Sequence, residues 1–476
     1  MSGASGEPER AARVRELAAR LADKVVGQAD ALARILPYLQ MYEAHLNPPD
    51  RPAGIFLLLG PTGTGKTRTA EAIAEVLHGS PKHLVKVDCA EYQSDHEVAK
   101  LIGAPPGYIG HRETKPILTQ ERLLAAVTAE CDLAVVLFDE IEKAAPAFTA
   151  LLLGILDRGT LRLGDNTPVS FEKSLVFLTS NLGARQMLNV VRPPIGFQGV
   201  ERRSPASIAD RLRSAGLEAV RRRFSPEFVN RLDAVITYRP LDAPALAEIL
   251  DHHVVELQRH VHTRLRERSF DILVEPAARR VLLARGTSDE FGARELRRTV
   301  HRLLTQPLAA LVADGGVPPG ALLRVGVSED GKTLQLRAEA PAPPSVGAAA
   351  SGPVVLLIDE NDDLRKTLEH ALSGAGIVPV AAGSAVEARE RAADHPPDLL
   401  VVDLVLPDGD GLSLAMELLG ALPRLRVVVT SGAELSAAEA AVCERQGIPV
   451  LRKPFLPEDA VNLVRAALQR SKAAGE

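Results

Sequence analysis

The stretch GIFLLLGPTGTGKT, residues 54–67, decides the fold of the first part of the chain. An apolar run leads into the pattern G-x-x-x-x-G-K-T, and the helical pattern RTAEAIAEVL follows. Strand, glycine-rich loop and helix together bind nucleotide phosphates, because glycine lets backbone N–H groups approach the phosphate oxygens. In such a loop Lys66 reaches the terminal phosphates and the Thr67 hydroxyl coordinates Mg²⁺. We therefore predict an ATP site at these residues: Gly60, Pro61, Thr62, Gly63, Thr64, Gly65, Lys66 and Thr67.

Two later apolar runs end in polar residues that suit phosphoryl transfer. The run LAVVLFDEIEKA, residues 133–144, ends its apolar part at Asp139 and Glu140. Asp139 suits Mg²⁺ coordination, and Glu140 suits polarising the water that attacks the terminal phosphate. The run VFLTSN ends at Asn181, which we predict to orient that water or to contact the γ-phosphate. Alone, such an asparagine is more often a turn residue, but the two other motifs favour the catalytic role.

Strand-length apolar runs alternate with helical patterns along most of the chain. Continuous apolar strands separated by helices predict an α/β fold, with a parallel sheet covered on both faces. The pattern becomes mostly helical after residue 238 and closes with a short strand pair, and the α/β alternation restarts after a segment rich in Ala, Pro, Ser and Gly. We predict four parts: an ATPase subdomain over 1–238, a smaller helical subdomain over 239–338, a flexible linker over 339–352 and a flavodoxin-like doubly wound domain over 353–476.

Composition narrows the class of protein. A chain of 476 residues is too long for one core. Its three cysteines are far apart and form no C-x-x-C pair, which argues against a disulfide framework or a zinc site. The N-terminus lacks the apolar core of a signal peptide, and no apolar run reaches membrane-span length, so we expect a cytoplasmic protein without a membrane partner.

Charge separates the chain into two unlike modules. The net charge of −5 argues weakly against nucleic acid as a main partner. Residues from 353 onward hold 12 Lys and Arg against 19 Asp and Glu, a net of −7, whereas the rest holds 44 against 42, a net of +2.

Residues from about 24 to 338 resemble the second ATPase module of the Clp-type AAA+ protein unfoldases, the ClpB, ClpA and ClpC group. The resemblance rests on the order and spacing of seven motifs: VVGQADA, LGPTGTGKT, GAPPGYIG, VVLFDEIEKA, LTSNLGA, RRRFSPEFVNRLD and EFGARELRR. It implies that Val25 and Val26 line the adenine pocket, that Arg231 is an arginine finger for a neighbouring subunit's ATP, and that Arg294 senses nucleotide. It also implies a homohexameric ring, in which a cation supplied across an interface makes hydrolysis depend on assembly.

The loop GAPPGYIGHR, residues 103–112, places a scarce aromatic between glycines. In the family that the chain resembles, such a loop lines the pore of the ring and grips an extended polypeptide. The resemblance therefore implies that Tyr108 and Ile109 contact a protein substrate, since an aromatic offers contact area with little polar demand. A tyrosine folded back onto the domain is the alternative. The chain departs from the family in the HRETKP that follows, where acids and glycines are usual, so grip or substrate preference is expected to differ.

A second loop, RPPIGFQGVE at residues 192–201, carries a tripeptide like the one with which some Clp unfoldases dock on the ClpP peptidase. By that resemblance, Ile195, Gly196 and Phe197 are candidate docking residues for a ClpP-like peptidase. Packing of these apolar side chains onto their own domain is the alternative, and three residues make a weak motif.

Residues 353–470 resemble a response-regulator receiver domain. Strands ending at Asp359, Glu360 and Asp403 would bring three carboxylates to one edge of the sheet, where they repel one another unless a divalent cation joins them. The resemblance implies that Mg²⁺ sits there, that Asp403 accepts a phosphoryl group from a histidine kinase or phosphotransfer protein, and that Thr430 and Lys453 contact the phosphoryl oxygens. Val450 stands where the family has an aromatic switch residue, so aromatic rotation is not expected. A receiver that docks without being phosphorylated is the alternative.

Together these patterns predict an ATP-driven, phosphorylation-regulated protein-remodelling ATPase. A subunit that delivers substrates to a peptidase is one alternative. A second is a transcription activator, since an AAA+ domain with a receiver is also the plan of that class. The chain lacks the G-A-F-T-G-A loop and the C-terminal helix-turn-helix of such activators, which disfavours it.

Overall fold

The structure is a computed structural model, and its three folded parts are described one by one. It describes residues 17–103, 116–191, 205–288, 291–328, 331, 333–339, 352–422, 425–432, 435–453, 455 and 457–469. Contacts group Met1–Ala245 with Thr287–Glu295, and Leu246–Gly286 with Leu296–Glu476. Most of the predicted linker, residues 340–351, lies outside the described residues.

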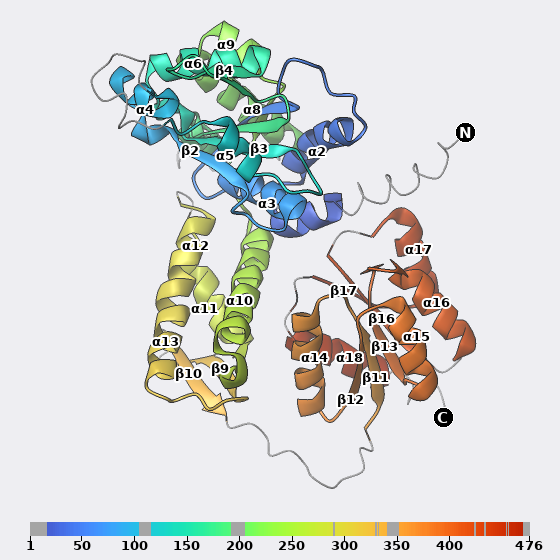
Figure 1. The fold of residues 1–476 in the computed structure, drawn as a ribbon. Coiled ribbons are helices and arrows are strands. Elements are labelled where there is room, and N and C mark those ends of the chain that lie inside the picture. Colours follow the sequence, from blue (N-terminus) through green and yellow to red (C-terminus); the bar gives the residue numbers. More distant parts are fainter. Residues whose placement is uncertain are drawn as a thin grey trace, which may run out of the picture. The chain divides into compact units, whose positions relative to one another are not determined.

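The first part is built on a five-stranded parallel sheet (Figure 1). In spatial order its strands are β2 (Leu84–Asp88), β3 (Ala134–Asp139), β6 (Ser174–Ser180), β1 (Gly54–Leu59) and β7 (Ala234–Thr237). Every residue of β1 is buried, as its unbroken apolar sequence requires of a strand covered on both faces. The predicted α/β architecture is therefore confirmed for this part.

Helices cover both faces of this sheet. Its helices are α2 (Ala29–Glu43), α3 (Lys66–His78), α4 (Val98–Ile102), α5 (Gln120–Ala125), α6 (Pro146–Arg158), α7 (Ala184–Val191), α8 (Pro205–Arg223) and α9 (Pro226–Asn230), and a small antiparallel hairpin joins β4 (Thr160–Arg162) to β5 (Pro168–Ser170). The α2 and α3 helices share one core cluster with one set of strand residues, whereas α6, α8 and α9 share the other.

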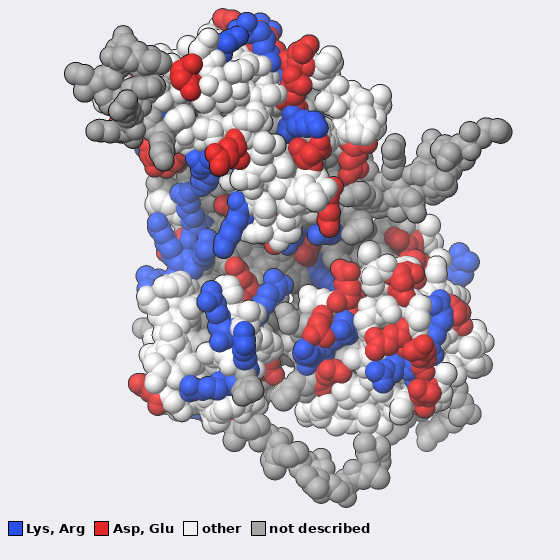
Figure 2. Space-filling model, viewed as in Figure 1, with Lys and Arg blue, Asp and Glu red and all other residues white. Residues whose placement is uncertain are grey.

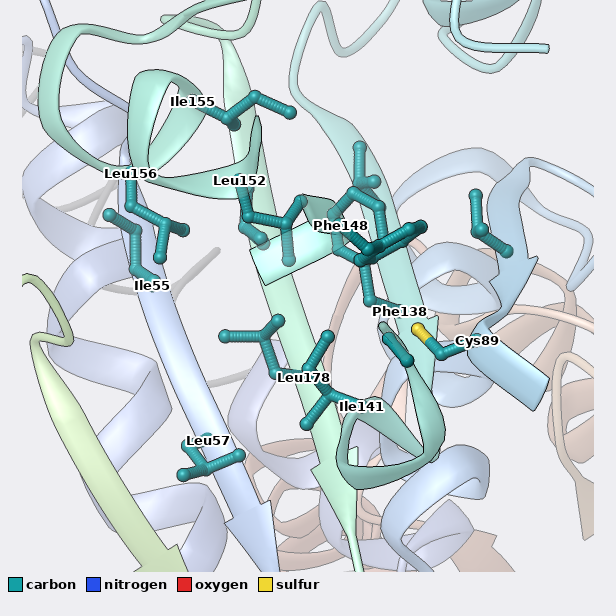
Figure 3. Close-up of a cluster of buried hydrophobic side chains, with 14 of the residues drawn as sticks. Ile55, Leu57, Cys89, Phe138, Ile141, Phe148, Leu152, Ile155, Leu156 and Leu178 are labelled. Carbon is teal, nitrogen blue, oxygen red and sulfur yellow. The ribbon is translucent and has the colours of Figure 1, made fainter. Parts of the chain in front are cut away.

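Side chains alternate between the two faces along each strand, so one strand contributes residues to both core clusters. In β1, Phe56 and Leu58 face the α2–α3 side, and Ile55 and Leu57 face the α6 side. Figure 3 shows the second cluster, in which aliphatic side chains of α6 and the β strands surround Phe138 and Phe148. Close packing on both faces holds the carboxyl ends of the strands rigidly in place, and the predicted ATP-site residues lie at these ends.

The second part, which follows β7, is mainly helical. Its elements are α10 (Ala243–Leu265), α11 (Pro276–Gly286), α12 (Ala293–Val300), α13 (Gln306–Ala313), β8 (Asp271–Val274), β9 (Leu322–Val327) and β10 (Leu334–Glu339), with a π-helical turn His301–Thr305 between α12 and α13. The sequence predicts the β9–β10 pair, and the structure shows that the two strands are antiparallel. It does not predict β8, a four-residue strand that joins β9 in parallel.

The third part is a second five-stranded parallel sheet, in the spatial order β12 (Val378–Ala382), β11 (Val354–Ile358), β13 (Leu399–Asp403), β16 (Arg426–Ser431) and β17 (Val450–Arg452). This 2-1-3-4-5 order is the flavodoxin-like one, which confirms the prediction. Its helices are α14 (Asp362–Gly374), α15 (Ala385–Asp394), α16 (Gly411–Ala421), α17 (Ala437–Gln446) and α18 (Pro457–Gln469), with a two-residue pair, β14 (Val405–Leu406) and β15 (Gly409–Asp410). The α14 and α18 helices pack on one face, and α15 and α16 on the other.

Surface charge on the third part mixes both signs. In Figure 2 its visible face carries many Asp and Glu side chains with Lys and Arg interspersed, in keeping with the acidic sequence of this part. In the described residues, no helix is both long enough and apolar enough to span a bilayer.

Candidate nucleotide and phosphoacceptor sites

The predicted phosphate-binding loop lies between β1 and α3. The α3 helix begins at Lys66, and Gly65 precedes it with a φ of 100°, a backbone conformation that strains any residue with a Cβ atom. Apart from its two neighbours in the chain, no residue that the structure describes has a heavy atom within 4 Å of the place where a Cβ on Gly65 would stand. The loop therefore has open space beside the first turn of α3, and such a helix N-terminus favours an anion.

The Lys66 ammonium is buried among oxygens of its own loop. It donates hydrogen bonds to the carbonyls of Gly60 at 2.7 Å and Pro61 at 2.8 Å, and to Asn181 Oδ1 at 2.9 Å. Burial lowers the pKa of Lys66 to about 8, even though the nearby carboxylates of Glu142 and Asp139 act to raise it. All three of these hydrogen-bond acceptors are neutral oxygens, so an anion that enters the loop would find the charge of the ammonium available.

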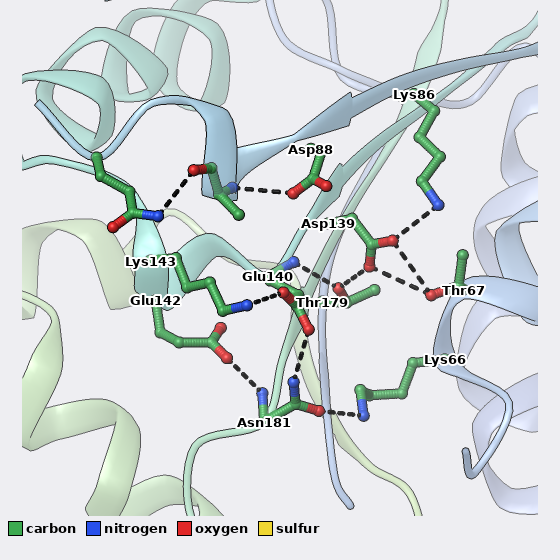
Figure 4. Close-up of polar contacts among 12 residues, drawn as sticks. Lys66, Thr67, Lys86, Asp88, Asp139, Glu140, Glu142, Lys143, Thr179 and Asn181 are labelled. Atoms are coloured by element: carbon green, nitrogen blue, oxygen red, sulfur yellow. Dashed lines mark hydrogen bonds and ion pairs between the residues drawn. The ribbon is translucent and has the colours of Figure 1, made fainter. Parts of the chain in front are cut away.

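Asp139, at the end of β3, collects donors from three elements (Figure 4). Thr67 Oγ1 of α3 donates to Asp139 Oδ1 at 3.2 Å, Thr179 of β6 donates to the same oxygen, and Lys86 of β2 lies 2.9 Å from Oδ2. Burial alone would raise the pKa of Asp139, but the hydrogen bonds from Thr179 and Lys86 outweigh it and lower the pKa. Asp139 is therefore held as a carboxylate beside the Thr67 hydroxyl, the pair of oxygens predicted to hold Mg²⁺.

Glu140 adopts a left-handed backbone conformation, with a φ of 57°. Its N–H donates to Thr179 Oγ1 at 2.9 Å, and its carboxylate accepts from Asn181 Nδ2 at 3.2 Å and pairs with Lys143 (Figure 4). Strained backbone of this kind is characteristic of functional sites. Asn181 therefore bridges Glu140 and Lys66, so the two strand-end motifs and the loop meet at one point, as the sequence predicts.

Residues Phe291 and Ala293 pack on the phosphate-binding loop at Gly63. The Ala293 N–H donates to the Gly63 carbonyl at 3.1 Å. The positive charge of Arg294 helps to lower the pKa of Lys66, although burial has the largest influence on that pKa and the carboxylates of Glu142 and Asp139 also have larger ones than Arg294. Arg294 thus lies within electrostatic reach of the phosphate site. Val25 and Val26 are both buried, and Val25 belongs to the core cluster on the α2–α3 side. Their contact with adenine stays a prediction.

Several residues of this site are missed by sequence reasoning. Gln28 Nε2 donates to the carbonyls of Thr64 at 3.1 Å and Arg239 at 2.9 Å, and Gln28 Oε1 accepts from the Arg239 N–H. Thr179 and Lys86 are the others. Alternation could have identified both, because Lys86 is two residues before the end of β2 and Thr179 is two residues before Asn181.

Arg231 follows α9 and is held by contacts at its side chain and its backbone. Its guanidinium pairs with Asp157 near the end of α6, and its carbonyl accepts from Arg51 Nη2 at 3.4 Å. About two fifths of each partner's side chain in the Arg231–Asp157 pair remains exposed, at 42% and 40%. The guanidinium is thus bound to α6 rather than to the phosphate-binding loop of its own chain, and its predicted role concerns another subunit's nucleotide.

Two predicted loops fall outside the described residues. Tyr108 and Ile109 lie in the undescribed segment 104–115, and Ile195, Gly196 and Phe197 lie in the undescribed segment 192–204. Both roles stay predictions.

In the third part, one lysine joins two strand ends. Lys453 Nζ lies 2.6 Å from Asp359 Oδ2, after β11, and 2.6 Å from Asp403 Oδ2, at the end of β13. Both aspartates are buried. Burial acts to lower the pKa of Lys453, but the two carboxylates outweigh it and raise the pKa. Burial raises the pKa of Asp403 to about 6; Lys453 opposes this rise and Asp359 adds to it.

The neighbouring strands fix this cluster. Thr430 is buried on β16 directly beside Asp403, and the Leu404 N–H donates to the Thr430 carbonyl at 2.9 Å. A Cβ on Gly411 would lie 1.8 Å from the Asp403 carbonyl oxygen, so only glycine fits there. Glu360 is exposed, unlike its neighbour Asp359. The structure thus brings Asp359, Asp403, Thr430 and Lys453 together, and its placement of Glu360 leaves that residue's metal role a prediction.

Both sites offer oxygen donors that suit Mg²⁺. In the described part of the chain, no three His, Cys, Asp or Glu side chains come together as a metal-binding cluster. Each site instead offers two protein oxygens at one point, Thr67 with Asp139 and Asp359 with Asp403. Mg²⁺ is held by one or two carboxylates while it keeps several waters or phosphate oxygens, so these pairs fit it.

Comparison with known families gives three matches along the chain. Residues 51–235 match the family model described as AAA domain (Cdc48 subfamily), residues 241–325 match the C-terminal D2-small domain of ClpB protein, and residues 355–465 match the response regulator receiver domain.

Similar proteins are found among curated sequences and solved structures. The chaperone protein ClpB of Meiothermus ruber is 37% identical over 337 residues, 71% of this chain and 36% of the relative. Heat shock protein 100 of Trypanosoma brucei brucei is 34% identical over 326 residues, 68% of this chain and 34% of the relative. The structure of the S. cerevisiae Hsp104:casein complex gives a TM-score of 0.58 at 26% identity, covering 71% of this chain and 53% of that one.

The chain spans about a third of the length of these curated relatives. The matches to the AAA and ClpB D2-small models fall in the first part of the chain, and the match to the receiver model follows them. The protein therefore combines a Clp-type AAA+ module with a C-terminal response-regulator receiver domain.

Proposed function

We propose that the protein hydrolyses ATP and uses the energy to unfold or remodel other proteins, as a homohexameric ring under the control of its receiver domain. The observation that carries the proposal is the meeting of Lys66, Glu140 and Asn181 at the edge of the first sheet, with hydrogen bonds of 2.9 and 3.2 Å through the Asn181 amide. The Asn181 side chain thus contacts both Lys66, the cation proposed for the phosphates, and Glu140, the carboxylate proposed for the water, which supports the proposal.

Each of these residues has a task in phosphoryl transfer. Lys66 exchanges its hydrogen bonds to neutral loop carbonyls for contacts with phosphate oxygens. The charge of the ammonium then stabilises the negative charge on the phosphates. Glu140 leaves Lys143 and accepts a proton from the attacking water, while Asn181 orients that water. When bound between Thr67 and Asp139, Mg²⁺ supplies charge neutralisation at the phosphates.

The ring is supported by the position of Arg231. Its half-exposed pair with Asp157 is weak, because exposed ion pairs contribute only about 0–1 kcal/mol. Release of the guanidinium toward an incoming phosphate therefore costs little. An arginine supplied by a neighbouring subunit makes hydrolysis depend on assembly, and Arg231→Ala should slow turnover on the order of 10³-fold, to a rate that can still be measured, while the ring still forms.

The test of the enzymatic part is Glu140→Gln, which keeps the size and hydrogen-bonding shape of the side chain but removes the base. Turnover should fall on the order of 10³-fold, the range that a general base contributes, with ATP binding retained. Glu172→Gln, on an exposed turn before β6, is the matched control. Turnover unchanged by Glu140→Gln would refute the assigned mechanism.

The substrate is proposed to be polypeptide, gripped by Tyr108 and Ile109 in the ring pore. Tyr108→Ala should spare ATP hydrolysis while abolishing the unfolding of a tagged fluorescent protein. Loss of both activities would instead assign the tyrosine to the stability of its domain.

Regulation is proposed to run through a phosphoryl group on Asp403, supplied by a histidine kinase or phosphotransfer protein. The cluster supports this proposal, because an incoming phosphoryl group would take over the ammonium of Lys453 and draw in the Thr430 hydroxyl. ATPase rate and oligomer size are measured with and without a small phosphoryl donor. A response is expected in the wild type and in the exposed control Asp394→Ala, but not in Asp403→Ala; no response in the wild type would remove this half of the proposal.

Delivery to a ClpP-like peptidase through Ile195, Gly196 and Phe197 is the narrower version of this function. A pull-down and degradation assay with Phe197→Ala as the comparison tests it. Without peptidase coupling, the stand-alone remodelling ATPase is the function that remains.

A further inference from the structure

Arg223, the last residue of α8, binds the backbone of the turn that carries the catalytic glutamate. Its Nε donates to the Glu142 carbonyl at 3.2 Å, and its Nη2 donates to the same carbonyl at 3.0 Å and to the Ala144 carbonyl at 3.1 Å. The two carbonyls therefore share one planar group, a geometry that suits a guanidinium and that a single ammonium cannot reproduce.

The other side of the same turn belongs to the ATP site. Glu142 Oε1 accepts the Asn181 N–H at 3.0 Å, and the Asn181 amide binds Glu140 and Lys66 (Figure 4). Glu142 Oε2 is buried and has no hydrogen-bond partner in the described structure. A buried carboxylate oxygen without a partner is unfavourable. Because the other oxygen of Glu142 is bound to Asn181, a movement of Asn181 would be passed to this turn.

Beyond Arg223 the chain leads directly to Arg231. The Arg223 guanidinium carbon lies 5.7 Å from the centre of the Phe224 ring, and Phe224 stacks on the buried Phe228 at 4.9 Å with an interplanar angle of 21°. The Arg231 N–H donates to the Phe228 carbonyl at 3.2 Å. Helix α9 is short and capped by Ser225, so residues 223–231 form one continuously packed stretch.

The far end of the stretch has a second arginine anchor. Arg51, just before β1, donates to the Arg231 carbonyl at 3.4 Å and to Asp233 Oδ1 at 2.9 Å, while Asp233 Oδ2 accepts the Ile55 N–H at 2.8 Å. This end is therefore fixed to the sheet. Displacement of the Arg223 end would pivot α9 about Arg51 and turn the Arg231 side chain.

We propose that Arg223 is a positioning residue that couples the turn bearing Glu140 to Arg231, so that the state of one subunit's ATP site sets how its arginine serves the next subunit. The inference rests on the proposed ring, in which Arg231 acts on a neighbouring ATP. It deepens that function by naming the contact through which the two sites communicate inside one chain.

The experiment is a double-mutant cycle on steady-state ATP hydrolysis by the full chain, with Arg223→Gln, Arg231→Ala and both together. Arg222→Gln is the matched control, since Arg222 is the preceding residue on the same helix and pairs with Glu218 one turn earlier. Arg223→Gln should lower kcat roughly tenfold, the fold-change expected when charge-assisted hydrogen bonds that position a catalytic group are lost. KM for ATP and the oligomer size should stay at wild-type values.

The double variant decides between coupling and independent effects. If Arg223 acts through Arg231, the double variant is no slower than Arg231→Ala alone, because the positioned group is already absent. Full multiplication of the two losses would overturn the inference. So would a variant that melts at lower temperature with unchanged kcat, which would make Arg223 a purely structural anchor.

Two further results keep the inference distinct from the function on which it rests. Arg223→Lys, which keeps the charge and the aliphatic stem, should recover the fold and only part of kcat, and it replaces Arg223→Gln if that variant does not fold. Wild-type kcat in Arg231→Ala would refute the proposed ring mechanism and the coupling together, whereas a slow Arg231→Ala with multiplicative losses would refute the coupling alone.

Discussion

Each of the protein's two five-stranded parallel sheets has a lysine near carboxylates at one edge, but the two lysines are in opposite electrostatic situations. Lys66 contacts two carbonyls and an amide, and burial lowers its pKa to about 8. Lys453 lies 2.6 Å from two carboxylates, which outweigh burial and raise its pKa. Among the residues that the structure describes, Lys66 therefore has no carboxylate in direct contact and can bind an anion, whereas the charge of Lys453 is already neutralised by two carboxylates.

This difference matches two kinds of chemistry. A site that must bind and release a phosphate in every cycle gains from a lysine held by neutral oxygens, because no ion pair has to be broken first. A site that switches once per modification gains from a lysine that is already paired, since a phosphoryl group then replaces an existing contact and rearranges its neighbours. Substitutions at the two lysines are therefore expected to have different consequences, one for binding and one for stability.

The largest effect is expected from Lys66→Met. Removing the cation should weaken ATP binding roughly 10³-fold, about 4 kcal/mol, since the phosphates would be buried without their counter-charge. Titration of a fluorescent ATP analogue measures it, with the exposed Lys82→Met as control. Stability without nucleotide should change less than in the matching Lys453 variant. Tight binding by Lys66→Met would show that the phosphates are neutralised elsewhere.

The next largest effect is expected from Lys453→Met, and it concerns stability. Two buried carboxylates would face each other unpaired, which should destabilise the receiver by about 3 kcal/mol. Hydrogen exchange of the β11 and β13 amides in the whole chain measures it, and Mg²⁺ should restore part of the protection. Lys366→Met, which removes an exposed lysine paired with the exposed Asp362, is the control. Equal protection in both variants would contradict the assigned pairing.

Much of both sites is predictable from sequence because strand ends are. An apolar run fixes where a strand stops, and parallel strands stop at one edge, so the amino-acid sequence is enough to place Asp139, Asn181 and Asp403 near their lysines. Glu360 shows the limit of this argument. Neighbouring residues at the end of a strand point in opposite directions, and Asp359 takes the buried direction while Glu360 is exposed.

Contacts across long stretches of sequence could not be predicted in this way. Gln28 donates a hydrogen bond to the carbonyl of Arg239, 211 residues later in the sequence. The Ala293 N–H donates to the Gly63 carbonyl, although α10 and α11 lie between these two residues in the sequence. Arg223 binds a turn about 80 residues before it. Each is a polar group that satisfies a distant backbone atom, and neither periodicity nor local spacing encodes the choice of that atom.

A pair of glycines extends the comparison to the backbone. Gly65→Ala should strain the loop by about 1–2 kcal/mol and point a methyl group into the open space beside α3, so ATP affinity should fall more than stability. Gly411→Ala should destabilise the receiver by about 2 kcal/mol, because its Cβ would overlap the Asp403 carbonyl oxygen. ATP titration and hydrogen exchange on both variants measure the two losses. Stability losses of the same size at both positions would contradict the open loop.

The smallest effect is a pH dependence that only Lys66 should show. Its pKa in the free protein is lowered to about 8, and phosphates raise it on binding, so the bound state holds the proton more tightly. ATP affinity should therefore be nearly constant between about pH 7 and pH 8 and should fall above pH 8 by up to about tenfold per pH unit, because binding then requires proton uptake. The phosphates themselves contribute little there, since the last pKa of a phosphate monoester is about 6. Lys66→Arg stays charged throughout this range and should bind ATP more weakly but without the slope. The same slope in Lys66→Arg would assign the titration to another group and remove the contrast between the two lysines.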